Sequence, residues 1–393
     1  RKRGTEMAER ALAHVEKIEW IRPIEGADNI ELIGVLGWVC IAKKGEFNVG
    51  DMAVYIEIDS KGPETDERFA FLSNKKFKVK TMRLGKFKVI SQGLALPLSL
   101  FPELQDRNIG DDVTEALKIT YTSEEDAARK TNKVDPNAKY KSMAKRRPKL
   151  FTNPIVRRIM RYGIGRKIMF LLFGRKKDNP KKFPDWIVKT DETRIENAPF
   201  YLQSTEKWIK TEKCDGTSCT FAVDRLKKGK NKFDFIVCSR NVRQADREQA
   251  CYHESNIYWE LADKYDIEKI LTQFATENDY NRVVLQGEGV GSVQGNPYKF
   301  TENQLFVFNL IIDGTRLGTV EMADFCKSHG LTSVPIIDTA YELPKTMEEM
   351  KLEADGYSEL NPKVKREGFV YRSQNGQQSF KNVSREYLLK HNG

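Results

Sequence analysis

Short apolar runs separated by turn residues characterise residues 14–115. Two such runs in residues 18–43 are split by a segment rich in Pro, Gly, Asp and Asn, and alternation of apolar with polar positions returns in residues 75–98. Val49-Gly50-Asp51 is a hairpin signal ahead of another apolar run. Five or six short strands with glycine kinks are typical of a small barrel. We therefore expect an OB-like, nucleic-acid-binding β-barrel domain within residues 1–115.

Residues 116–184 lack the pattern of a packed domain. Their first half is polar, and their second half mixes apolar and basic side chains at helix-like spacing. Such a segment could dock on a phosphate backbone, lie on a membrane or cover a core. The pattern predicts a basic linker or insert between two domains.

From residue 185 to residue 393 the pattern is that of an α+β domain. Acids follow Thr190 and Asp191, which is helix-start chemistry. Further helices are expected at residues 245–277, 319–329 and 344–353. Strand-like apolar runs occupy residues 218–223, 233–240, 282–291, 304–312, 367–373 and 376–384.

Composition places the chain among globular proteins of two or three domains. Of its 393 residues, 39% are apolar and 31% are charged. No apolar run approaches the ~18 residues that cross a bilayer, and the start has no signal-peptide pattern. The six cysteines form no CxxC pair, which argues against structural zinc and for free thiols. We expect an intracellular protein, in cytoplasm or nucleus, and favour a monomer.

The positive charge is concentrated in one part of the chain. The net charge is +10, but residues 141–182 hold fifteen Lys or Arg and one acid, so this segment carries +14 and the rest −4. Residues 75–88 add seven basic residues and no acid, interleaved with Phe77 and Phe87. Cations beside aromatic rings suit a nucleic-acid groove, although lysines also protect edge strands. A polyanionic partner is indicated, either nucleic acid or an anionic membrane.

One lysine stands in a sequence context that suits covalent catalysis. In Lys213-Cys214-Asp215-Gly216, a neutral lysine amine could attack the α-phosphorus of a nucleoside triphosphate. An ordinary lysine is almost wholly charged at neutral pH, so burial or nearby positive charge would have to lower its pKa. Gly216 permits close approach of backbone and ligand. The four residues alone are weak evidence.

An ordered series of short motifs strengthens this interpretation. Lys213 to Gly216 is followed by CSRN at 238–241, GEG at 287–289, FVFNL at 306–310, EGFVYR at 367–372 and SFKNVS at 379–384. Over about residues 185–393, the series resembles the covalent nucleotidyltransferase superfamily of ATP-dependent ligases and capping enzymes. The resemblance implies an ATP-grasp-like domain of antiparallel sheets and helices.

Two further features resemble RNA ligases with an N-terminal OB domain. DNA ligases and capping enzymes usually have an arginine where Ser218 stands, and they append an OB domain after the last lysine motif. Here only 12 residues follow Lys381. The OB-like domain comes first instead.

The resemblance implies a role for each motif residue. Lys213 would be the adenylylated nucleophile, with Asp215 and Gly216 completing its nucleotide-binding motif. Glu212 would help to define the adenine site through its backbone, and Arg240 would contact the ribose or the RNA end. For Glu212 the alternative is a solvated acid, and for Arg240 a strand-end salt bridge.

The later motifs would supply acids, an aromatic ring and a cation. Glu288, between two glycines that would let backbone and ligand approach, would accept a ribose hydroxyl or hold a metal-bound water. Glu367 would orient the metal. Phe308 would stack on adenine, although Phe306 and Phe308 share a strand face and could be core. Lys381 would neutralise the α-phosphate and pyrophosphate. Many relatives have two lysines in this motif, and residues 379–383 have one.

The implied activity is ATP-dependent joining of RNA 3′-hydroxyl and 5′-phosphate ends through lysyl-AMP and an adenylylated RNA end. ATP and Mn²⁺ or Mg²⁺ are the implied cofactors. RNA is the implied partner, as nicked duplex or single strands, and the basic insert is expected to extend its binding surface. The alternatives are an mRNA guanylyltransferase or DNA ligase of the same superfamily, and a non-catalytic, OB-containing RNA-binding protein.

Overall fold

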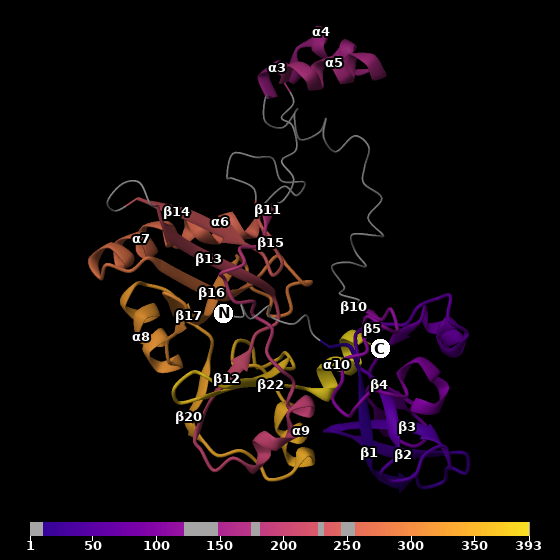
Figure 1. Ribbon diagram of the computed structural model, residues 1–393. Coiled ribbons are helices and arrows are strands. Elements are labelled where there is room, and N and C mark those ends of the chain that lie inside the picture. The colour runs from indigo at the N-terminus through magenta and orange to yellow at the C-terminus, as the bar shows by residue number, and fades with distance from the viewer. Residues whose placement is uncertain (1–10, 122–147, 174–180, 227–231, 245–255, 393) are drawn as a thin grey trace.

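The computed structural model describes residues 11–121, 148–173, 181–226, 232–244 and 256–392. Figure 1 shows an N-terminal β domain in indigo beside a larger C-terminal α+β domain in magenta to yellow. Within the described residues, no helix combines the length and the apolar character needed to cross a membrane.

Five antiparallel strands form the main sheet of the N-terminal domain, in the order β3-β2-β1-β4-β9. Apolar clusters lie on both sides of this sheet because successive side chains point to opposite faces. The five strands are β1 (Ala13–Pro23), β2 (Ile30–Val35), β3 (Trp38–Lys43), β4 (Met52–Ile56) and β9 (Leu94–Pro97).

Smaller elements complete this domain. A three-stranded sheet has the order β10-β5-β6, and β7 pairs with β8. The elements are β5 (Ser60–Lys61), η1 (Glu67–Lys75), β6 (Lys78–Val79), β7 (Met82–Leu84), β8 (Val89–Ser91), η2 (Leu98–Leu100), η3 (Pro102–Leu104) and β10 (Thr120–Tyr121).

The predicted hairpin at Val49-Gly50-Asp51 is wrong. Strand β4 pairs with β1 and β9, not with β3. The turn is held by β1 instead, because the Gly50 N–H donates to the Ile18 carbonyl and the Ile18 N–H donates to the Asp51 carbonyl. The turn signal was correct, but its partner strand is distant in sequence.

Two sheets form the body of the C-terminal domain. The large sheet has eight strands in the order β11-β15-β14-β13-β16-β17-β18, with β19 paired to β17, and the small sheet has the order β20-β12-β21-β22. Their strands are β11 (Lys181–Lys182), β12 (Trp208–Lys213), β13 (Thr217–Arg225), β14 (Phe233–Cys238), β15 (Val242–Arg243), β16 (Arg282–Val290), β17 (Gln304–Ile312), β18 (Thr315–Arg316), β19 (Thr332–Ser333), β20 (Ile336–Tyr341), β21 (Gly368–Ser373) and β22 (Ser379–Val383).

Helices cover the large sheet with their apolar faces. The largest core cluster joins α6, α7 and α8 to strands β13, β16 and β17. The helix expected at 245–277 is two helices in its described part, broken at Asp266, whose φ is 48°; residues 245–255 lie outside the described residues. The helices of this domain are α6 (Ile257–Lys264), α7 (Ile267–Glu277), α8 (Thr319–Ser328), α9 (Met347–Ala354) and α10 (Arg385–Asn392).

The helix predicted to start at Thr190 and Asp191 does not form. The chain is extended there and then makes two 3₁₀ turns, η4 (Ile195–Asn197) and η5 (Pro199–Gln203). The Lys381 N–H donates to the Thr193 carbonyl, so this segment is held against β22 rather than coiled. Tertiary pairing outweighs the local helix-start chemistry.

The described part of the basic insert is a small helical unit. It consists of α3 (Pro148–Thr152), α4 (Pro154–Met160) and α5 (Gly163–Phe173), which pack mainly on one another. Figure 1 shows the unit standing apart from the two domains. The insert therefore does not cover a core with these helices.

Direct contacts join the two domains. The Trp38 indole N–H donates to Asn197 Oδ1 at 2.6 Å, and the Arg194 guanidinium lies 3.3 Å from Asp59 Oδ2. Val383 and Leu388 of the C-terminal domain belong to an apolar cluster of the N-terminal domain. The N-terminal domain thus supports the strand that carries the last lysine motif and the helix that follows it.

His14 makes the stability of the N-terminal domain sensitive to pH. Burial lowers its pKa, but hydrogen bonds and charge from Glu16, at 2.8 Å, and Glu57, at 3.6 Å, outweigh burial and raise the pKa to about 9. A raised pKa stabilises the fold fully below the unfolded-state value near 6.5, and this stabilisation is lost as pH rises through about 9. The full effect is on the order of 3 kcal/mol.

We therefore expect the melting temperature to fall between pH 6.5 and pH 9 in the wild type. His14→Gln should be less stable at pH 6.5 and should lose most of this pH dependence, as measured by calorimetry across the range. An unchanged slope in the variant would show that other groups set the pH response.

Candidate active site

A cavity of about 580 Å³ lies where the two C-terminal sheets meet, and Asp59 and Tyr121 of the N-terminal domain complete its wall. All the site residues predicted from the motifs line it. They are Glu212, Lys213, Asp215, Gly216, Arg240, Glu288, Phe308, Glu367 and Lys381. The structure thus brings six separated motifs into one pocket.

Lys213 is positioned by the end of β12 and by the tight turn that follows. Strand β12 pairs with β21, which places Lys213 opposite Gly368. A Cβ at Gly216 would lie 2.4 Å from the Gly289 carbonyl oxygen, so only glycine lets the chain turn from the small sheet into the large one. Glycine is therefore required at position 216 because the backbone packs closely there.

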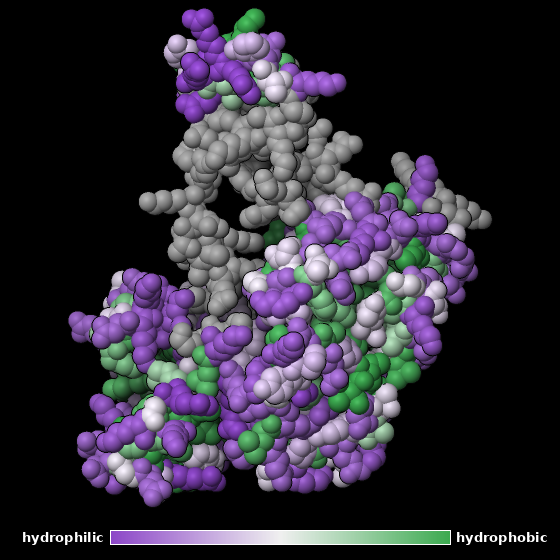
Figure 2. Space-filling model, turned by 180° about the vertical axis from the view of Figure 1, so that it is seen from behind, coloured by the Kyte–Doolittle hydropathy of each residue, from purple (hydrophilic) through white to green (hydrophobic). Residues whose placement is uncertain are grey.

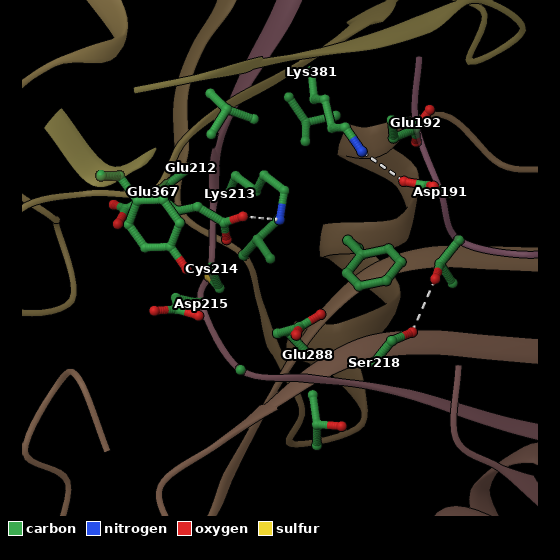
Figure 3. Close-up of a pocket in the computed structure, with 18 of the residues that line it drawn as sticks. Asp191, Glu192, Glu212, Lys213, Cys214, Asp215, Ser218, Glu288, Glu367 and Lys381 are labelled. Carbon is green, nitrogen blue, oxygen red and sulfur yellow. Dashed lines mark hydrogen bonds and ion pairs between the residues drawn. The ribbon is translucent and has the colours of Figure 1, made fainter. Parts of the chain in front are cut away.

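The Lys213 amine contacts a carboxylate. Its Nζ lies 2.6 Å from Glu367 Oε1, and Figure 3 shows the two side chains pointing toward each other. Burial lowers the pKa of Lys213, but Glu367 and Glu288 more than offset it, so the pKa is raised. The expectation of a lowered pKa is wrong for this state, because the acids around the amine outweigh its burial.

Glu288 lies on β16, where it is opposite Ser218 of β13. Burial raises its pKa to about 8, and Lys213 partly opposes that shift. The glycines on either side were expected to let a ligand approach. Instead, a Cβ at Gly287 would meet the Phe306 carbonyl and one at Gly289 would meet Cys219, each within 3 Å. These glycines allow close strand and helix packing.

A second charged cluster lies across the pocket from Glu367. Lys381 Nζ is 2.6 Å from Asp191 Oδ1, and Arg240 Nη2 is 3.1 Å from Asp191 Oδ2. Figure 3 shows Lys381 and Asp191 opposite the Lys213–Glu367 pair. The two cations are thus held next to each other by one acid.

The motif with a single lysine has a buried arginine beside it. Arg372 pairs with Ser379 across β21 and β22, and both residues share one face. Arg372 is 3% exposed, lines the cavity and lies 3.2 Å from Glu192 Oε1. A second cation is therefore present where residues 379–383 offer only one lysine.

Glu212 is fixed by buried hydrogen bonds, whereas Phe308 is partly exposed at the cavity wall. Glu212 is buried; its side chain accepts hydrogen bonds from the Ser358 hydroxyl and, at 2.7 Å, from the Glu359 N–H. The alternative of a solvated acid is therefore wrong. Phe306 is 5% exposed in an apolar cluster, whereas Phe308 is half-buried and lines the cavity.

Several pocket residues were not identified from the sequence. Neither Asp191, in the segment interpreted as a helix start, nor Arg372, inside a quoted motif, was assigned a role in the site. Tyr387, on α10, gave no signal, because its approach to the pocket depends on how the C-terminal helix packs. These lining residues include Asp59, Tyr121, Asp191, Glu192, Arg194, Arg372 and Tyr387.

The donor set fits a divalent ion only in the presence of substrate. Among the described residues, no group of three His, Cys, Asp or Glu side chains could hold a metal. Glu288 and Glu367 both raise the pKa of the Lys213 amine, so two carboxylates lie near the same point and could serve as metal ligands. Mg²⁺ and Mn²⁺ take oxygen ligands, and phosphate oxygens and water would complete their coordination.

Comparison with known proteins gives two family matches. Residues 12–98 match an OB-fold domain family, and residues 206–388 match the RNA ligase family. No curated protein matches the chain.

Solved structures of an RNA ligase from Naegleria gruberi match almost the whole chain. The structure with pyrophosphate has a TM-score of 0.74 and 31% identity, and covers 98% of this chain and 99% of its own. A lysine-to-methionine variant with AMP and Mn has a TM-score of 0.74 and 31% identity, covering 97% and 99%. A lysine-to-alanine variant with ATP and Mn has a TM-score of 0.73 and 30% identity, and covers 97% of this chain and 99% of its own. The predicted fold class, an OB-like domain followed by an α+β ligase domain, is confirmed.

The Lys213–Glu367 pair leads to a prediction about reactivity. Glu367→Gln removes the carboxylate nearest to the amine, so the pKa of Lys213 should fall. The pH midpoint of Lys213 acylation by a small reagent, followed by peptide mass spectrometry, should fall accordingly. Glu342→Gln is the matched control, because Glu342 pairs with the exposed Lys207. Equal midpoints in wild type and Glu367→Gln would contradict the pairing.

Proposed function

Because this chain belongs to the RNA ligase family, we propose that it joins RNA 3′-hydroxyl and 5′-phosphate ends with ATP, through an AMP carried on Lys213. The observation that supports this most is the arrangement of the cavity. A lysine amine lies between two acids, and a cluster of cations faces it. These are the parts that phosphoryl transfer needs: a nucleophile, charge neutralisation and fixed geometry.

In the first step, Lys213 Nζ attacks the α-phosphorus of ATP. The N–P bond forms, the bond from phosphorus to the bridging oxygen breaks, and pyrophosphate leaves. The amine must first lose a proton, so its contact with Glu367 has to be released. Lys381 and Arg240 neutralise the charge on the phosphates.

A divalent ion held by Glu367 and Glu288 would supply further positive charge to the phosphate oxygens. The Naegleria ligase was solved with ATP and Mn and with AMP and Mn. We therefore assign ATP and Mn²⁺ to this site, with Mg²⁺ as the alternative. Phe308 stacks on the adenine ring, while Glu212, Asp215 and Gly216 shape the rest of the nucleotide site.

In the second step, an oxygen of the RNA 5′-phosphate attacks the phosphorus of lysyl-AMP, and the N–P bond breaks. In the third, the RNA 3′-hydroxyl attacks the 5′-phosphate, loses its proton, and AMP leaves. The basic residues 75–88 suit the RNA strand, because they are mostly exposed and β7 lies next to α10, whose Tyr387 lines the cavity.

The proposed acceptor is RNA rather than DNA or a cap. Ser218, at the position where DNA ligases and capping enzymes usually have arginine, hydrogen-bonds Thr190 at 2.9 Å. The position is thus filled by two hydroxyl groups. A non-catalytic RNA-binding protein is disfavoured, because Lys213, Glu288, Glu367 and Lys381 line one cavity.

The test is self-adenylylation. Incubation with ATP labelled at the α-phosphate, in the presence of Mn²⁺, should leave label on the chain, and Lys213→Ala should abolish it. Lys207→Ala, which changes a half-exposed lysine outside the cavity lining, should keep it. Labelled GTP should label the chain far less. Label that survives Lys213→Ala, or a preference for GTP, would overturn the proposal.

A further inference from the structure

Within the part of the chain that the structure describes, the helical insert exposes large hydrophobic side chains at a much higher density than the rest does. Among the described residues, seven of the nineteen large hydrophobic side chains that are exposed lie within residues 148–173. Contiguous exposed apolar surface usually marks an interaction site, whereas scattered single residues do not. The seven are Ile155, Ile159, Tyr162, Ile164, Ile168, Leu171 and Leu172.

These side chains form two stripes of helical spacing. Ile155, Ile159 and Tyr162 follow one another at intervals of four and three, on α4 and the turn after it. Along α5, Ile164, Ile168 and Leu171 repeat the same spacing, with exposures of 75%, 51% and 86%. Residues at i, i+4 and i+7 lie on one face of a helix. Each stripe is therefore a continuous apolar face.

Another face of α5 is packed inside the unit. Met169 is 5% exposed, and a Cβ at Gly165 would lie 2.0 Å from the Ile159 carbonyl oxygen. The helices thus approach each other closely through a glycine. The apolar stripes remain outside this contact, and Figure 2 shows hydrophobic residues among hydrophilic ones on the surface of the unit.

The charge of the insert identifies what could cover the stripes. Residues 148–173 contain six cations and no acid: Lys149, Arg157, Arg158, Arg161, Arg166 and Lys167. An anionic surface would match these cations, and only a partner with an apolar layer would gain from the isoleucines and leucines. RNA phosphates would leave those side chains in water. An anionic bilayer offers headgroup charge and acyl chains together.

We propose that residues 148–173 bind the surface of an anionic membrane and hold the ligase there. Helix α5 has 11 residues, or about 16 Å of rise, against about 30 Å for the hydrocarbon core. The helices therefore lie in the headgroup region, with their apolar stripes inward and their arginines at the lipid phosphates. This surface is separate from the proposed catalytic cavity, and neither depends on the other.

Vesicle sedimentation of the full chain tests the proposal. Vesicles of phosphatidylcholine with roughly one third phosphatidylserine should bind the protein, and pure phosphatidylcholine should bind it weakly. A stripe variant, Ile164→Ser with Ile168→Ser and Leu171→Ser, should bind more than tenfold more weakly. A charge variant with Gln at 157, 158 and 161 should bind on the order of 100-fold more weakly.

Matched controls separate this effect from misfolding and from the ligase chemistry. Val49→Ser with Ile109→Ser and Leu352→Ser changes three side chains of similar exposure outside the insert, and it should bind vesicles like the wild type. Self-adenylylation should be equal in the wild type and in all of these variants. If the wild type itself did not self-adenylylate, that result would count against the proposed function and not against membrane binding.

Two results would overturn the membrane proposal. One is absence of binding to the anionic vesicles, or equal binding by wild type and stripe variant. The other is a charge variant that loses affinity for single-stranded RNA while the wild type does not bind the vesicles. The second result would make the insert an RNA surface.

Discussion

One partly buried ion pair, between Lys213 and Glu367, sets the charge at the centre of the cavity. At 2.6 Å the carboxylate raises the pKa of the amine and so favours its protonated form. The same contact fixes the direction of the lysine side chain at the end of β12. In the proposed mechanism the pair would therefore orient the nucleophile while holding it inactive, and activation would require release of Glu367.

The opposite wall depends on a comparable arrangement. Asp191 holds Lys381 and Arg240 together, while Glu192 pairs with Arg372. Acids thus keep the cations of the cavity close to one another before any phosphate enters. These acid partners offset the repulsion between neighbouring cations within the fold. In the proposed reaction, incoming phosphates would replace the carboxylates as partners of the cations.

Much of this could be predicted from sequence. The apolar runs gave the strands, and the motif order gave the residues that line the cavity, because short motifs on strands keep their local geometry. The helix at Thr190 and the hairpin at Gly50 failed, since pairing to β22 and to β1 is distant in sequence. The pKa of Lys213 was misjudged because Glu288 and Glu367 lie 75 and 154 positions away along the chain. Asp191 and Tyr387 were given no role in the site.

The chemistry of the AMP linkage tests the central claim most directly. After incubation with ATP and Mn²⁺, peptide mapping should place one AMP on the peptide that contains Lys213. The bond should survive alkali and break in acid, as a phosphoramidate does. AMP on another peptide, or an alkali-labile bond such as a mixed anhydride with Glu288 or Glu367, would show that Lys213 is not the nucleophile.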